Sequence, residues 1–109
     1  MSLDAEALSN TMILAARDAV AERWPAVKAL AEVELRRLAQ SLIEIKGLVA
    51  SGRIDQPGAQ KLIQIHQMTV RSVLLTVKGI GLATAERVTF VAVEAVTGIV
   101  NEVVGFKLL

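Results

Sequence analysis

The stretch GLATAERVTFVAVEAVTGIVNEVVGF, residues 81–106, is strongly apolar and decides how the chain folds. Drawn as a helix, it gathers five of its polar residues in one arc about 100° wide. These residues are Glu86, Arg87, Glu94, Thr97 and Asn101. The remaining arc of roughly 260° is mostly apolar, whereas a surface helix needs only one apolar stripe. Other helices must therefore cover this segment on nearly every side.

The composition favours one domain without a strong electrostatic field. The chain has 109 residues with 12 Lys plus Arg and 11 Asp plus Glu, a formal net charge of +1. A charge so close to zero does not attract nucleic acid or anionic lipid as a bulk effect. Cysteine is absent, which excludes disulfides, thiolate catalysis and cysteine-built metal sites. That absence suits the reducing cytoplasm, where we expect the protein.

The apolar end of the chain does not have the pattern of a membrane span. A spanning helix needs about 20 mostly uncharged residues. The longest uncharged runs in this part of the chain, Gly79–Ala85 and Ala95–Asn101, have seven residues each. The N-terminus has no basic region followed by an apolar core, so we expect no signal peptide. We therefore expect a soluble protein with no membrane span.

The first two helices are expected to meet at Pro25. Ser2 or Asp4 can cap a helix over about 3–24. Pro25 ends that helix, because proline disfavours helical geometry in the residue before it and suits the first turn of the next helix. The second helix, about 25–51, has an apolar stripe with heptad spacing of 4, 3, 4, 3 and 4 residues. The stripe consists of Ala31, Leu35, Leu38, Leu42, Ile45 and Val49.

A third helix continues the same apolar spacing. Ser51-Gly52 ends the second helix, and Asp55 or Gln56 caps the next one. The stripe then resumes at Ala59, Ile63, His66, Val70, Val73, Val77 and Ile80. We predict a helix over 56–106 that packs antiparallel on the second helix, with roughly 40 Å of contact.

The predicted fold is all-α: a single domain, 1–109, with a short N-terminal helix and a long antiparallel helical hairpin. One chain of this length has little surface with which to cover its apolar end. We therefore expect self-association into a four-helix or larger bundle, with a symmetric dimer favoured. The expected interface residues are Leu82, Val88, Val91, Ala92, Ala95, Val96, Ile99 and Val103. The expected function is that of a non-enzymatic structural or interaction protein, whose partner is itself or another helical protein.

A glycine motif at the start of the apolar segment supports a different function. Leu74, Val77, Gly79, Ile80, Gly81, Ala85 and Val88 fit the pattern hxxhxGhGxxxAxxh, in which h is apolar. Over residues 74–88 this pattern resembles the helix-hairpin-helix motif of many DNA-repair and recombination proteins. The resemblance implies a tight turn and a DNA phosphate bound by backbone N–H groups at the start of the following helix. The residues of this alternative site are Lys78, Gly79, Gly81, Ala83 and Arg87.

The preferred interpretation places these glycines inside a continuous helix, with a break at 79–81 as the alternative. Two mid-helix glycines cost about 1 kcal/mol each, which close approach of a neighbouring helix can offset. Lys78 stands where the motif commonly has proline, and Leu82 stands where it often has a proline, polar or basic residue. The few basic residues nearby would support only weak binding to phosphates. DNA binding therefore stays the alternative function.

The single histidine, His66, lies on the apolar stripe between Ile63 and Val70. The antiparallel hairpin would bring it within reach of Ser41 or Glu44 on the second helix. Histidine can act as a pH switch or as a metal ligand shared between subunits. A buried polar residue that sets the helix register is the preferred interpretation.

The sequence lacks the residue patterns of the common catalytic and metal sites. Di-iron helical bundles use a Glu-x-x-His step, but Ile63 stands three residues before His66. There is also no nucleotide-binding loop and no nucleophile elbow. We expect no enzyme activity, no metal and no cofactor. An amphipathic protein at a membrane surface is a further alternative, which the scarcity of Lys and Arg on the polar face disfavours.

Overall fold

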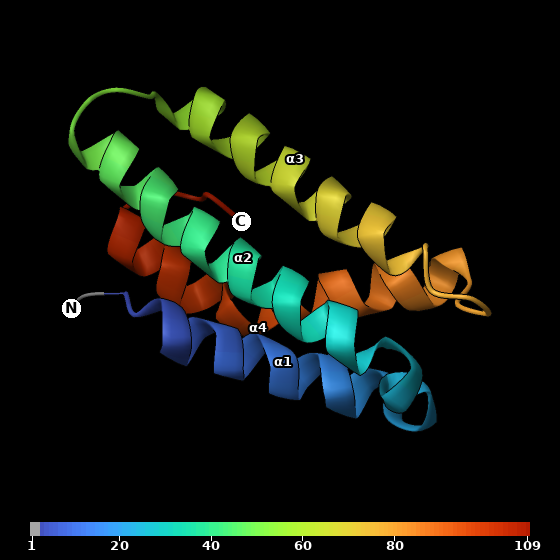
Figure 1. Cartoon of the computed structure of the whole chain (residues 1–109). Helices are drawn as coiled ribbons and strands as arrows, with labels where there is room; N and C mark the ends of the chain where they lie inside the picture. The colour runs from blue at the N-terminus through green and yellow to red at the C-terminus, as the bar shows by residue number, and fades with distance from the viewer. Residues whose placement is uncertain (1–2) are drawn as a thin grey trace.

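Residues 3–109, the part of the chain that the computed structural model describes, fold into four α-helices in up-down-up-down order (Figure 1). The helices are α1 (Ala5–Val20), α2 (Trp24–Ala50), α3 (Gln56–Leu74) and α4 (Leu82–Val104), and a short 3-10 helix, η1 (Ala21–Arg23), joins α1 to α2. The bundle is elongated, with extents of 43 × 23 × 18 Å. The prediction of an all-α fold is confirmed.

The first three helices begin at local signals in the sequence. The Asp4 carboxylate accepts a hydrogen bond of 2.9 Å from the backbone N–H two residues on, at the start of α1. Ser2, the other predicted cap, lies outside the described residues. Pro25 stands in the first turn of α2, and Asp55 caps α3 by accepting a 2.8 Å hydrogen bond from the Gly58 N–H. A side chain at the cap therefore satisfies an N–H group that the helix itself leaves unpaired.

Helices α2 and α3 run antiparallel and bury apolar stripes against the rest of the bundle (Figure 1). The buried heptad positions of α2 are Ala31, Leu35, Leu38, Leu42 and Ile45. Those of α3 are Ala59, Ile63, Val70 and Leu74. Leu74 is fully buried where the predicted stripe has Val73, which is half-buried.

The predicted continuous helix over 56–106 is wrong. Helix α3 ends at Leu74, and α4 begins at Leu82 after a reversal of the chain. The structure therefore has the break that the alternative interpretation placed at 79–81, and this break begins several residues earlier. Heptad spacing did not reveal the break, because Val77 and Ile80 in the turn continue the 4-3 spacing of the apolar residues in α3.

The turn between α3 and α4 depends on Gly79. This glycine has a φ of +85°, in the left-handed region that residues with a Cβ avoid. The Ile80 N–H donates to the Val77 carbonyl over 3.1 Å, which closes the turn. Gly81 then adopts an extended conformation with φ −81° and ψ 166°, and serves as the N-cap of α4.

The reversal packs α4 against α1, which corrects the expected self-association surface. The buried residues of α1 include Leu8, Met12, Ala16 and Val20. Those of α4 include Ala85, Val88, Ala92, Val96 and Val100. Three residues of the predicted interface, Val88, Ala92 and Val96, are at most 1% exposed. They are unavailable to a second copy because the chain itself covers them.

The residues after α4 fold back onto the bundle. The Asn101 side-chain oxygen accepts hydrogen bonds from the N–H groups of Leu108 and Leu109, at 3.0 and 2.9 Å. The Gln60 side-chain amide of α3 donates to the Lys107 carbonyl over 2.6 Å, and Leu108 is buried. Asn101 therefore holds the end of the chain in place, a role that its position in the polar arc of the helix does not predict.

Gly79→Ala should lower the free energy of unfolding by about 1–2 kcal/mol, because an L residue is strained in the left-handed region. Gly81→Ser is the matched control. The site has an extended backbone and open space where a Cβ would lie, and serine is a good N-cap, so we expect unchanged or higher stability. Urea denaturation followed by circular dichroism measures both variants. Equal losses would contradict the assigned turn.

Candidate functional site

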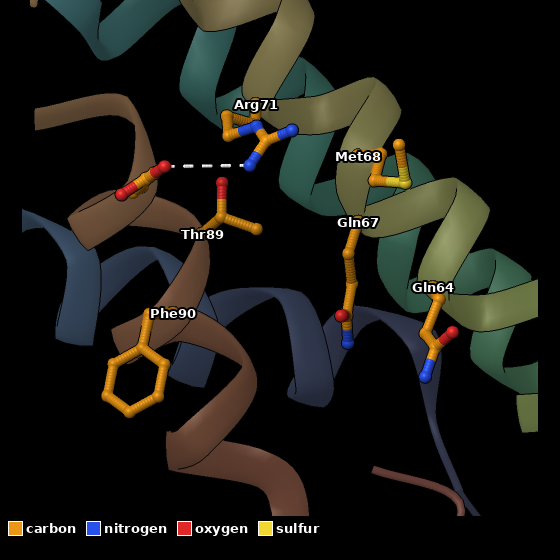
Figure 2. A pocket seen from close by; sticks show the side chains of 7 residues that line it. Gln64, Gln67, Met68, Arg71, Thr89 and Phe90 are labelled. Atoms are coloured by element: carbon orange, nitrogen blue, oxygen red, sulfur yellow. Dashed lines mark ion pairs between the residues drawn. The ribbon is translucent and has the colours of Figure 1, made fainter. Parts of the chain in front are cut away.

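Helices α3 and α4 flank an open groove with a volume of about 340 Å³ (Figure 2). It exists because α3 packs mainly on α2 and α4 mainly on α1, so that α3 and α4 are the most loosely packed neighbours in the bundle. The lining residues are Gln64, Gln67, Met68, Arg71, Glu86, Thr89 and Phe90. Figure 2 shows the two glutamine side chains of α3 extending from the helix on one side and Thr89 and Phe90 on the other.

An ion pair joins the two walls of the groove near the turn. The Arg71 Nη1 atom lies 3.5 Å from the Glu86 Oε1 atom, and Figure 2 draws this pair as a dashed line. The side chains are 38% and 51% exposed, so water screens the pair and its contribution is about 1 kcal/mol or less. The pair therefore contributes little to stability, but it shows which residues of α3 and α4 lie side by side.

Large apolar side chains stand exposed at the groove and on the neighbouring outer side of α3: Met68 and Phe90 line the groove, and Ile65 lies with Met68 in an adjoining hollow. Ile65 and Met68 on α3 are 58% and 56% exposed, and Phe90 on α4 is 65% exposed. Leu75, just after α3, is 39% exposed. Single exposed apolar residues are normal, but a group of them marks a surface that makes contacts. We call the surface formed by these four residues the α3–α4 face.

Helix α3 carries a second stripe with heptad spacing, on the side away from the core. Its residues are Lys61, Ile65, Met68, Ser72 and Leu75, at spacings of 4, 3, 4 and 3. The buried stripe has the same spacing and lies two residues earlier at each step. The second stripe is visible in the sequence, but only the folded chain shows that α3 is covered on one side alone and leaves this stripe exposed.

The residues of the predicted interface on α4 do not form one exposed surface. Val91 and Val103 are half-buried, in addition to the fully buried members described above. Leu82, Ala95 and Ile99 remain exposed, but Ile99 lies nine residues after Phe90 and therefore about 180° away around the helix. The exposed apolar surface of α4 is thus divided between two sides, and only Phe90 belongs to the groove.

The glycine motif forms the turn between α3 and α4, and its apolar residues pack toward the core. Its residues Leu74, Ala85 and Val88 are fully buried, and Val77 and Ile80 are half-buried against the core. The start of α4 has no side-chain cap among residues 3–109, and the first N–H groups of any helix lack partners within the helix. Backbone donors are therefore available at this helix end.

Basic side chains around this helix end come from three parts of the chain. Lys78 and Arg87 are exposed, as the sequence predicts. The Arg87 Nε atom donates to the Ala19 carbonyl of α1 over 3.3 Å, which draws it toward α1. Arg23 of η1 lines the same small hollow as Ala83 and Arg87. Sequence reasoning missed Arg23, because no local pattern connects residues so far apart in the chain.

His66 lies between α2 and α3, half-buried beside Ser41. The small hollow at this point is also lined by Glu34 and Arg37, and not by the predicted Glu44. The Glu34 side chain is only 5% exposed, and its Oε2 atom lies 3.2 Å from the Arg37 Nη1 atom. The surroundings of His66 are those of a helix interface.

Within residues 3–109, no three His, Asp or Glu side chains gather closely enough to hold a metal ion. Over the same range no helix is both long and apolar enough to cross a membrane. Comparisons with known proteins find no family model, no curated protein and no solved structure that matches the chain. The function of the chain must therefore be inferred from its two candidate surfaces, the α3–α4 face and the start of α4.

Arg37→Met should lower the free energy of unfolding by about 1 kcal/mol, because it leaves the buried Glu34 carboxylate without its partner, although water screens the exposed Arg37 guanidinium. The double variant Glu34→Gln/Arg37→Met should regain most of this loss, since a neutral amide costs less to bury than a carboxylate. Urea denaturation of the two single variants and the double variant measures the coupling. Strictly additive losses would contradict the role of the ion pair.

Proposed function

We propose that this chain is a non-enzymatic helical interaction protein that works by self-association through the α3–α4 face. The observation that carries the proposal is the exposure of Met68 and Phe90 on the two sides of one groove, with Ile65 exposed beside Met68 on the outer side of α3. A soluble monomer would leave these side chains in water permanently. Covering them with a second copy also fills the most loosely packed side of the bundle.

The energetics support a contact that uses the whole α3–α4 face. Burying one large apolar side chain contributes about 1.5–3 kcal/mol, and less where the side chain is already partly covered. Association must offset an estimated 4–15 kcal/mol of lost translational and rotational freedom. One side chain is therefore insufficient, whereas the four residues of the face, buried together, contribute an amount within the range of this cost. A symmetric dimer uses each of these residues twice.

The proposal gives the protein no catalytic residue, metal or cofactor, and assigns its action to the cytoplasm. Its working part is a helical surface, so its partner is a second copy of the chain. Another helical protein could use the same heptad spacing on α3, and such a complex is the outcome to consider if the isolated chain stays monomeric.

Phe90→Asp should convert the dimer into a monomer, because a charge in the middle of the apolar contact cannot be buried without a partner. Leu14→Asp is the matched control: Leu14 is 49% exposed on α1, on the far side of the bundle from α3 (Figure 1). The measurement is the molar mass from light scattering after gel filtration, over a range of concentrations. A monomeric wild-type protein would contradict the proposal.

A second candidate function is binding of DNA phosphates at the start of α4. The left-handed Gly79 and the uncapped helix end, with Arg23, Lys78 and Arg87 nearby, favour it. Against it, Leu82 places an exposed apolar side chain at the same point, and Arg87 is bound to α1. Few phosphates would be neutralised, so the expected binding is weak and strongly dependent on salt.

Under this second function, Gly81→Val should weaken binding to short duplex DNA at low salt at least tenfold, because its side chain would block close approach of the phosphate. The helix content should not change, since Gly81 is extended and has open space around it. Lys46→Ala is the control, because it removes a positive charge near the C-terminal end of α2, away from the start of α4. Fluorescence anisotropy measures both variants, and unchanged binding by Gly81→Val would exclude this site.

A further inference from the structure

We propose that the dimer is formed by α3 of one copy lying antiparallel on α4 of the other, with Lys61 facing the partner's Glu94. The two-fold axis then runs parallel to the helices, between the two α3–α4 faces. This arrangement rests on the proposed self-association and goes beyond it by specifying which helices meet and in which register.

The charges on the two helices are complementary. Helix α3 carries only positive charges, Lys61 and Arg71. Helix α4 carries three glutamates and one arginine, and that arginine is bound to α1. A dimer with α3 on α3 would bring like charges together, whereas α3 on α4 pairs opposite charges. Complementary charges of this kind set the orientation and register of a contact.

The Arg71–Glu86 ion pair fixes which residues of α3 and α4 stand at the same height along the bundle. From this pair, Lys61 lies ten residues back along α3 and Glu94 lies eight residues forward along α4. At 1.5 Å per residue these steps are about 15 and 12 Å, so the two residues are nearly level. A two-fold axis parallel to the helices leaves heights unchanged, and so Lys61 faces the partner's Glu94.

The same register places the apolar residues of the two faces against each other. Met68 lies three residues back from Arg71, and Phe90 lies four residues forward from Glu86. These steps are about 4.5 and 6 Å, which sets the partner's Phe90 at the height of Met68. The heptad spacing of the outer stripe on α3 provides the gaps between side chains that a facing helix requires.

Lys61 and Glu94 are both free to make this contact. Both residues are exposed, and neither takes part in an ion pair among residues 3–109. The ion pair would lie at the rim of the contact, with the apolar residues toward its centre. Its main effect is therefore on the choice of register, while Met68 and Phe90 supply most of the affinity.

Cross-linking between two single-cysteine variants tests the arrangement directly, because the natural chain has no cysteine. Lys61→Cys and Glu94→Cys proteins are mixed, allowed to exchange subunits and treated with a short bis-maleimide. We expect the mixture to give a covalent dimer at least five times as abundant as either variant alone. Asp18→Cys, at an exposed site on α1, replaces Lys61→Cys in the control mixture and should give no increase.

Charge reversal gives a second readout. Lys61→Glu and Glu94→Lys should each raise the dimer dissociation constant about tenfold in low salt, and the double variant should restore it. A wild-type dimer without the cross-link and without this rescue would overturn the arrangement and leave self-association intact. A monomeric wild-type chain would overturn both. The molar mass of the untreated protein therefore separates the two failures.

Discussion

Helix α4 is apolar around most of its circumference, and the other helices are arranged so that this surface is covered. The reversal at Gly79 makes the cover possible, because it turns α4 back along the bundle and lays it against α1. A continuous helix from Pro57 onward would carry the same residues away from α1 and leave them in water. A glycine adopts this left-handed conformation at little cost in free energy. With the turn in place, α1 of the same chain covers the apolar surface of α4, which a continuous helix would have to bury against another molecule.

The features that could be predicted from the sequence are those that depend on neighbouring residues. Caps and prolines placed the starts of α1, α2 and α3, because each acts through hydrogen bonds or steric contacts with the next few residues. The break before α4 was only an alternative, since Val77 and Ile80 keep the spacing of the preceding helix. The cover supplied by α1 was missed because the match between two helices so far apart in the chain leaves no local pattern.

The candidate sites also divide into features set by neighbouring residues and contacts between residues far apart in the chain. The position of His66 beside Ser41 follows from the antiparallel pairing of α2 and α3, which heptad spacing predicts. Arg23 could not be connected with Arg87 because only the folded chain brings η1 to the start of α4. Helical position alone places Asn101 in the polar arc of α4, and it does not predict the hydrogen bonds of Asn101 to the end of the chain.

The groove lies between α3 and α4 because these two helices pack less closely than the other neighbouring pairs in the bundle. Four helices have four neighbouring contacts, and α1 meets both α2 and α4 closely, while α2 also meets α3. The apolar surface of α4 is used mainly on α1, so little of it remains for α3. Met68 of the outer stripe and Phe90 then remain exposed on the two sides of the groove, at similar heights along the bundle. The surplus apolar surface is therefore much smaller than the sequence indicates, and it lies on α3 as well as on α4.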